Sequence, residues 1–253
     1  MTTLEAIFLG IVQGMTEFLP VSSSGHLVLT QNLLGWQEPN LAFNIWLHFS
    51  TLLAIVLFFW KDWRGLSKKE WLVILVGSIP AAVVGVFFAD VIETWFGSTK
   101  LVAAALVVTG LFNLKTNTVL RKQNAVNHQL EVGFRRGFII GLFQALAIIP
   151  GVSRSGSTVF AGITQGLDRI KAFKFSFFLS LPAILGASLL QLIKVWNQGT
   201  QQSISPSYFF AGLTAFMTGL ASLYIFEFVI KKARIDWFGW YCLSLGIAYL
   251  VIF

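Results

Sequence analysis

Long hydrophobic runs separated by short polar segments extend along the whole chain of 253 residues. Four of these runs are free of Asp, Glu, Lys and Arg over about 20 residues, the length that a helix needs to cross a bilayer core of about 30 Å. Two shorter runs reach that length when their flanks are included. The pattern therefore predicts six membrane spans, at Leu41–Trp60, Trp71–Ala89, Leu101–Leu114, Phe175–Ile193, Ser207–Phe226 and Trp237–Phe253.

Helices, rather than barrel strands, are the predicted form of these spans. Only helices and closed barrels satisfy backbone groups in lipid, and the runs lack the apolar–polar alternation of barrel strands. Composition agrees with an all-α membrane protein, because 56% of residues are hydrophobic and 11% are charged, against roughly 25% in soluble domains. The single Cys242 excludes an internal disulfide. Met1–Glu5 lack a basic signal-peptide start, so we expect the first hydrophobic segment in the mature protein.

Basic residues gather on one side of the predicted bundle. If the six spans alternate in direction, one face carries 15 of the 18 Lys and Arg residues, and the opposite face carries only Lys100 and Lys194. Arg154 falls inside a hydrophobic segment. By the positive-inside rule the basic face is cytoplasmic, which predicts both termini outside a bacterial cytoplasmic membrane. This distribution explains the net charge of +7 without a nucleic-acid partner.

The chain repeats itself at an offset of 131 residues, and six of sixteen positions are identical between 10–25 and 141–156. Each half, approximately 1–120 and 132–253, holds one such motif segment followed by three spans. Because three is odd, the second half enters the membrane in the opposite direction. The sequence therefore predicts one membrane domain, 1–253, built as an inverted repeat. The identical pairs are Gly10 and Gly141, Gln13 and Gln144, Val21 and Val152, Ser22 and Ser153, Ser24 and Ser155, and Gly25 and Gly156.

Each motif segment is predicted to break in the middle of its apolar stretch. The breaks are Pro20–His26 and Pro150–Thr158, where proline, serine and glycine interrupt a helical pattern that then resumes. We expect Ser24 and Ser155 to cap the helices that follow. Non-helical backbone at membrane depth is tolerated only inside protein or along a wet cavity, which favours two re-entrant hairpins. The hairpins are predicted to dip from opposite sides and meet near the midplane.

The meeting point has the features of a phosphate site. A helix that resumes after a Ser/Gly turn directs unpaired N–H groups and the positive end of its dipole at the turn, and two such ends suit a pyrophosphate. The guanidinium of Arg154 can bind phosphate oxygens bidentately. Because a positive charge at membrane depth is energetically unfavourable, we expect a counter-charge beside it, either a bound anion or Glu17. The candidate substrate-binding residues are Ser22, Ser24, Gly25, Ser153, Ser155, Gly156 and Thr158.

The two halves differ where reactive groups stand, and these positions supply the candidate catalytic residues Glu17, Ser23, His26 and Arg154. Either Ser23 or His26 could attack phosphorus, or His26 could act as general base toward a serine or water. Gln13 and Glu17 are four residues apart on one helical face, where their oxygens are candidate ligands for Mg²⁺ or Ca²⁺ together with substrate phosphate.

Two stretches, Gln13–His26 and Pro150–Gly156, resemble the signature motifs of the undecaprenyl-pyrophosphate phosphatase family. Length, span count and inverted repeat are similar to that family over the whole chain. The resemblance implies an enzyme that removes the terminal phosphate of the C55 carrier lipid, a polyprenyl pyrophosphate, at a site open to the periplasm, with a divalent cation. It also implies recycling of the carrier for peptidoglycan synthesis and a contribution to bacitracin resistance.

Carried over by position, the family's acidic pair falls on Gln13 and Glu17, its serine on Ser23, its histidine on His26 and its arginine on Arg154. The family pattern accepts Gln in place of the first Glu. Gln13 nevertheless removes one carboxylate, so a two-Glu metal site is excluded in this chain.

Other interpretations remain open at this point. Inverted repeats with broken helices also occur in secondary transporters, and the same features permit lipid flipping. A membrane scaffold without a site leaves the cost of burying Glu17 and Arg154 unexplained. His48, in the middle of a span, is interpreted as a hydrogen-bonded histidine between helices and is left out of the site. Membrane lipids are expected partners, and the sequence is compatible with a homodimer.

Overall fold

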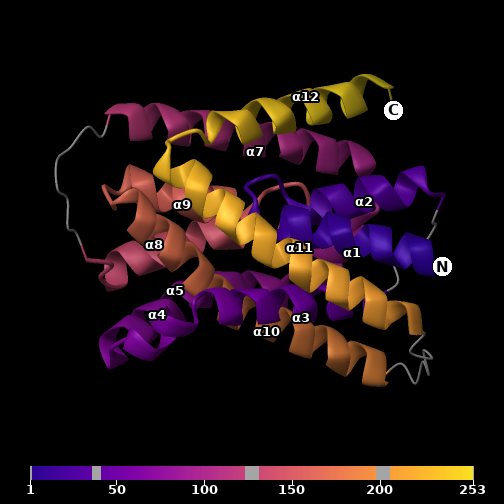
Figure 1. The fold of residues 1–253 in the computed structure, drawn as a ribbon, viewed down its shortest axis with the longest axis horizontal. Coiled ribbons are helices and arrows are strands. Elements are labelled where there is room, and N and C mark those ends of the chain that lie inside the picture. The colour runs from indigo at the N-terminus through magenta and orange to yellow at the C-terminus, as the bar shows by residue number, and fades with distance from the viewer. Residues whose placement is uncertain (1, 36–40, 123–130, 198–205, 253) are drawn as a thin grey trace.

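The computed structural model describes residues 2–35, 41–122, 131–197 and 206–252 (Figure 1). Over these ranges the chain forms helices and no strand, which confirms the predicted all-α class. Phe253, the last residue of the final predicted span, lies outside the described ranges. The helices are α1 (Thr3–Phe18), α2 (Ser23–Leu33), α3 (Leu41–Phe58), α4 (Trp60–Gly65), α5 (Lys68–Phe87), α6 (Ala89–Phe96), α7 (Thr99–Lys122), α8 (Phe134–Leu146), α9 (Arg154–Thr164), α10 (Arg169–Asn197), α11 (Pro206–Lys231) and α12 (Asp236–Ile252).

Four described helices are long and apolar enough to cross a membrane, namely α5, α7, α11 and the Arg169–Leu190 part of α10. α3 and α12 have shorter apolar segments, Ala42–Phe58 and Asp236–Ile252. These six helices coincide in sequence with the six predicted spans. Their outer faces expose large hydrophobic side chains, among them Phe87 at 77% and Val251 at 80%, so the surface fits lipid rather than water.

The helices pair in a two-fold pattern that crosses between the halves of the chain. α1 of the first half packs along α11 of the second, and α8, the repeat counterpart of α1, packs along α5 of the first. α7 packs against α12, and α3 packs against α10. Each of the last two pairs joins helices that occupy matching positions in the two halves. Each half therefore completes its core with helices of the other.

Glycines allow the two motif helices, α1 and α8, to approach their neighbours closely. A side chain at Gly14 would meet the carbonyl oxygen of Ala215 on α11 at 2.4 Å, and one at Gly141 would meet that of Gly77 on α5 at 2.0 Å. Both contacts are to helix backbone, which cannot move aside as a side chain can. Both motif helices thus carry a small-residue contact face of the kind that packs helices in membranes.

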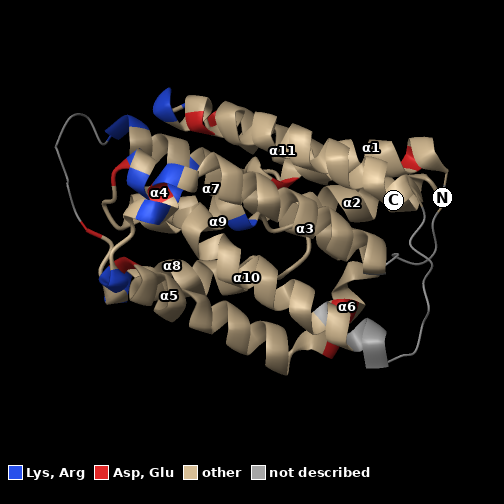
Figure 2. Cartoon of the chain, turned by 60° about the horizontal axis from the view of Figure 1, so that its bottom comes forward, with Lys and Arg blue, Asp and Glu red and all other residues tan. Residues whose placement is uncertain are grey.

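Figure 2 shows Lys and Arg gathered at one end of the bundle, while both ends of the chain lie at the opposite end. The basic end includes Lys68 at the start of α5, Lys122 at the end of α7 and Lys231 at the end of α11. Lys100, in the first turn of α7, lies at the other end of that helix, and Arg154 begins α9 in the interior with a side chain only 16% exposed. The side chain of Lys194 lies outside the described part of the structure.

Both predicted helix breaks are present, one between α1 and α2 and one between α8 and α9. The backbone turns through the left-handed region at Ser22, where φ is 70°, and at Gly151, where φ is 97°. At Gly151 a side chain would also lie 2.3 Å from the carbonyl oxygen of Val102, so both conformation and space require glycine. Ser22 adopts a conformation that is uncommon for a residue with a side chain.

The caps of α2 and α9 differ from the prediction. Ser22 and Ser153 are the N-cap residues, and their hydroxyls accept from the backbone N–H three residues further on, at 3.3 and 3.2 Å. The prediction of Ser24 and Ser155 as caps was wrong. α2 begins at Ser23 and α9 at Arg154, each directly after its N-cap, so these two serines already lie in the first helical turn.

Candidate active site

α7 holds the two breaks against each other through two polar residues one turn apart. The hydroxyl of Thr109 donates to the carbonyl oxygen of Gly151 at 2.8 Å and accepts from the N–H of Ser153 at 2.9 Å. The amide of Asn113 donates to the carbonyl oxygen of Pro20 at 2.6 Å. Backbone groups left unpaired by the breaks therefore find partners on a neighbouring helix, which makes the irregular backbone tolerable inside an apolar bundle.

The first turns of α2 and α9 also contact the opposite breaks directly. Ser24 Oγ accepts from the N–H of Gly151 at 3.4 Å, and Ser155 Oγ donates to the carbonyl oxygen of Leu19 at 3.2 Å. A side chain added at Gly25 would lie 3.2 Å from the Cα atom of Gly151. The two breaks therefore meet, as the repeat predicts.

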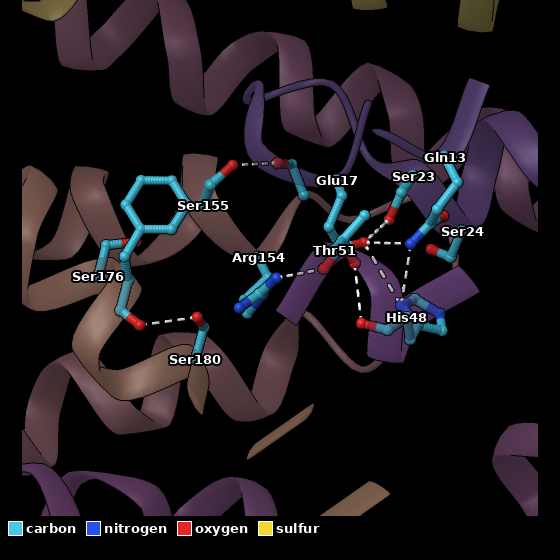
Figure 3. Close-up of polar contacts among 12 residues, drawn as sticks. Gln13, Glu17, Ser23, Ser24, His48, Thr51, Arg154, Ser155, Ser176 and Ser180 are labelled. Atoms are coloured by element: carbon cyan, nitrogen blue, oxygen red, sulfur yellow. Dashed lines mark hydrogen bonds and ion pairs between the residues drawn. The ribbon is translucent and has the colours of Figure 1, made fainter. Parts of the chain in front are cut away.

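Glu17 and Arg154 form an ion pair across this junction (Figure 3). Nη2 of Arg154 donates to Oε1 of Glu17, and the two side chains are 16% and 4% exposed. Desolvating an unpaired charge costs several kcal/mol, so the pairing explains how both residues are tolerated at this depth in the bundle. The structure identifies Glu17 as the counter-charge that Arg154 was predicted to need.

The second carboxylate oxygen of Glu17 accepts from two further donors. Ser23 Oγ donates to Oε2 at 2.6 Å, and Gln13 Nε2 donates to the same oxygen at 3.0 Å. A hydroxyl so close to a carboxylate is placed to transfer its proton when the oxygen attacks an electrophile. The structure therefore brings Gln13, Glu17, Ser23 and Arg154, from α1, α2 and α9, into one cluster.

His48 of α3 extends this cluster. Nε2 of Gln13 lies 3.0 Å from Nδ1 of His48, and an amide nitrogen only donates, so Nδ1 is the acceptor and a neutral ring carries its proton on Nε2. The same Nδ1 lies 3.6 Å from Oε2 of Glu17. His48 is hydrogen-bonded, as its sequence position predicts, but its side chain is 32% exposed and lines the cavity that holds Glu17. Sequence reasoning left this residue out of the site.

The cluster lies in the wall of a cavity of about 610 Å³. Gly25, Ser155 and Gly156 are buried and contribute nothing to this wall. Apolar residues of α5 and α10 form much of the remaining wall. The polar lining residues from the two breaks and their surroundings are Glu17, Ser22, Ser23, Ser24, His48, Gln144, Ser153 and Arg154.

Two predicted site residues make their polar contacts elsewhere. Nδ1 of His26 donates to the carbonyl oxygen of Ser22 at 2.8 Å, and Nε2 accepts from the hydroxyl of Tyr241 on α12 at 2.7 Å. Both ring nitrogens are therefore engaged away from Glu17. The hydroxyl of Thr158 lies 2.6 Å from that of Ser176 on α10, in the interior between two helices. Neither His26 nor Thr158 lines the cavity.

Gln13 and Glu17 offer two oxygens as candidate ligands for a divalent cation. Within the described residues, no three His, Cys, Asp or Glu side chains gather into a metal site. Oε1 of Gln13, however, is buried without a hydrogen-bond partner in that part of the chain, one helical turn from the carboxylate of Glu17. Mg²⁺ keeps several waters and binds through one or two carboxylates together with phosphates. These residues therefore fit a cation that arrives with a phosphate group, rather than one held by protein alone.

Gln144 is a further polar residue of the cavity that sequence reasoning did not include in the site. It is 3% exposed, and neither its amide nitrogen nor its amide oxygen has a partner within the described chain. Its repeat position, opposite Gln13, was a signal that could have identified it. For Thr109 and Asn113 the signal was a pair of polar residues four apart inside an apolar span.

Comparisons with known proteins identify the family of the chain. The chain matches the family described as Bacitracin resistance protein BacA over residues 6–248. The undecaprenyl-diphosphatase of Halothermothrix orenii is 38% identical over 100% of this chain and 98% of its own length. The undecaprenyl-diphosphatases of Thermosipho africanus and Methanococcus vannielii are 38% and 37% identical, over 96% and 94% of this chain and 98% and 96% of their own lengths. The chain therefore belongs to the BacA family of bacitracin resistance proteins.

Proposed function

We propose that this protein is a membrane phosphatase that hydrolyses undecaprenyl diphosphate to undecaprenyl phosphate and inorganic phosphate. The observation that carries the proposal is the contact of Ser23 and Arg154 with the two oxygens of Glu17, beside a cavity inside an apolar bundle. This cluster offers a nucleophile, a base and a cation for phosphate in one place. Relatives named undecaprenyl-diphosphatase that match along their whole length support this choice of substrate.

The diphosphate binds between the starts of α2 and α9. The first-turn N–H groups and the positive dipole ends of both helices favour an anion there. Arg154 exchanges its contact with Glu17 for phosphate oxygens, which a guanidinium binds bidentately. Ser22, Ser24 and Ser153 contribute hydroxyls from the cavity wall. The remaining predicted residues do not line the cavity and support the starts of α2 and α9 instead; they are Gly25, Ser155, Gly156 and Thr158.

Ser23 is the nucleophile and Glu17 is its base in this proposal. As Ser23 Oγ bonds to the terminal phosphorus, its proton passes to Oε2 of Glu17, and the bridging P–O bond breaks to release undecaprenyl phosphate. Water then attacks the phosphoserine, Glu17 returns the proton to the departing Ser23 Oγ, and the oxygen and both hydrogens of the water leave with inorganic phosphate. The contacts of His26 with Ser22 and Tyr241 disfavour His26 in either role.

A divalent cation, Mg²⁺ or Ca²⁺, is part of the proposal. Oε1 of Gln13 and the carboxylate of Glu17 would hold it together with diphosphate oxygens. The cation supplies charge neutralisation of the diphosphate when bound. With Gln13 in place of a second carboxylate, the protein supplies a single negative charge, so the affinity for metal depends on the substrate.

His48 positions Gln13, and through it Glu17. Replacing His48 with Leu leaves one N–H of Gln13 unpaired, and we expect kcat to fall about tenfold with little change in KM, the effect of losing one hydrogen bond in the active site. His48→Asn keeps an acceptor close to the position of Nδ1 and should restore most of the activity. Steady-state kinetics on both variants checks this. Equal impairment of the Asn and Leu variants would contradict the positioning role.

We also infer that the six apolar helices cross a bacterial cytoplasmic membrane and that the pairs α1/α2 and α8/α9 are re-entrant. The exchange of helices between the halves supports an inverted repeat, because α1 packs on α11 as α8 packs on α5. With the basic end inside, both termini face outward, and we expect the site to be reached from that side. In this orientation the enzyme regenerates the lipid carrier for peptidoglycan synthesis.

Cysteine labelling checks this orientation. Gly65, at the end of α4 near the basic end, and Gly97, after α6, have room for a side chain, and the native Cys242 is buried. In intact cells, a membrane-impermeant maleimide should label Gly97→Cys and not Gly65→Cys, which should react only after the membrane is permeabilised. The opposite labelling pattern would invert the orientation.

Phosphate release separates the phosphatase from its main rival, a transporter or flippase. We expect purified protein in detergent, where nothing can be transported, to release inorganic phosphate from undecaprenyl diphosphate and none from undecaprenyl phosphate. Removing divalent cations with EDTA should stop the release, and Mg²⁺ should restore it. Folded protein that releases no phosphate but moves the lipid across proteoliposomes would favour the rival.

A further inference from the structure

α5 and α10 lie side by side along the bundle (Figure 2). At Gly77 they touch, because a side chain there would meet Leu179 of α10 at 2.8 Å. About two turns further along each helix, side chains added at Gly85 and Gly186 would meet nothing within 4 Å, and both glycines line the cavity. Two helical turns span about 11 Å. The helices therefore enclose a gap that begins just beyond their contact.

The gap continues from the polar end of the cavity. Small residues form much of its walls, namely Ala81, Ala82 and Gly85 on α5 and Ala183, Gly186 and Ala187 on α10, and Val86, Leu189 and Leu190 also line it. Among the residues that line the cavity, Glu17 and Arg154 are the charged ones, and both belong to the opposite, polar end. One cavity thus has charged residues at one end and an uncharged channel at the other.

Ala82 and Ala187 line the cavity and are exposed at the surface of the bundle, so the channel has an opening on the side of the bundle. In a membrane this opening faces lipid, because the neighbouring surface positions are the exposed hydrophobic residues Val83, Val86 and Leu185. At the inner end, Gln144 brings an amide with two unpartnered atoms into the same cavity wall. A buried, unpaired amide points to a polar ligand group at that end.

We propose that the gap between α5 and α10 is the lateral entrance and the binding channel for the isoprenoid chain of the substrate. The assignment rests on the proposed function. A lipid diphosphate whose head binds between the starts of α2 and α9 must place its first isoprene units within the same cavity. The channel is the part of this cavity that keeps these units away from the charged side chains. Walls of Ala and Gly leave room for the methyl branches of each unit. Gln144 donates to the diphosphate at the channel's inner end.

The channel is tested by the preference for a long chain over a short one. Ala82→Phe and Ala187→Phe place rings in the channel. Their matched controls, Val83→Phe and Leu185→Phe, place the same ring on exposed positions of the same helices outside the cavity. For each variant, kcat/KM is measured with undecaprenyl diphosphate and with the short-chain farnesyl diphosphate, and the ratio of the two values is the readout.

We expect the ratio to fall about tenfold or more in Ala82→Phe and Ala187→Phe, through a higher KM for the long chain, and to stay at the wild-type value in both controls. An unchanged ratio would overturn the assignment, as would equal losses on both substrates, which mean damage to the catalytic site or the fold. A wild-type ratio near one would also overturn it, because the tail then contributes no binding. Failure of wild-type protein to hydrolyse either diphosphate would instead remove the proposed function itself.

Discussion

Replacing Glu17 with Gln is expected to lower the rate of phosphate release about 10³-fold, within the range for loss of a general base. The amide keeps the shape of the side chain but cannot take the proton of Ser23, which now donates to Oε2 at 2.6 Å. The measurement is kcat for undecaprenyl diphosphate in detergent. Glu227→Gln is the matched control, since Glu227 pairs with Lys231 at 2.8 Å near the basic end of α11, away from the site.

The same substitution also affects folding, because it leaves Arg154 buried without its counter-charge. Removing one partner of a buried ion pair costs about 3–5 kcal/mol. The double variant Glu17→Gln/Arg154→Met removes both charges and should regain thermal stability without regaining activity. A stable double variant that hydrolyses the substrate at the wild-type rate would contradict the roles given to both residues.

Ser23→Ala is expected to reduce phosphate release about 10³-fold or more, because the variant lacks the oxygen that forms the phosphoenzyme. Ser23 is half-buried at the start of α2, so a methyl group fits in its place. The control is Thr164→Ala, which removes a hydroxyl that bonds only within α9, to the carbonyl oxygens of Phe160 and Ala161. Thermal stability of both variants should stay close to that of the wild type.

The companion variant His26→Ala separates the two candidate nucleophiles. It removes the contacts to Ser22 and Tyr241 and should cost far less activity than Ser23→Ala, because His26 does not line the cavity. Mass spectrometry of acid-quenched enzyme should find phosphate on Ser23. Phosphate on His26, with an active Ser23→Ala variant, would reverse the assignment.

The junction of the two breaks could be predicted because its signals are local and repeated. Proline, serine and glycine at Pro20–His26 and Pro150–Thr158 interrupt otherwise apolar segments, and an offset of 131 residues relates the two. The need to compensate a buried Arg154 pointed to Glu17 without any knowledge of distance. These inferences depend on backbone chemistry and charge, which the sequence displays directly.

Side-chain direction was beyond the sequence. His26 follows Ser23 by three residues in α2, and only the packing of α12 turns its ring toward Tyr241 rather than Glu17. His48 reaches Gln13 because α3 packs against α1. The spacing of residues within one helix does not predict a contact between two helices. The capping error at Ser24 had a smaller cause, since helix starts depend on the φ and ψ angles of one or two residues.

Product analysis tests the central claim most directly. Wild-type protein, incubated with undecaprenyl diphosphate and Mg²⁺ in detergent, is assayed for inorganic phosphate while the lipid product is identified by mass spectrometry. We expect equimolar undecaprenyl phosphate and inorganic phosphate, and near-complete loss of both with Glu17→Gln. Unchanged substrate, or undecaprenol released together with inorganic pyrophosphate, would contradict it.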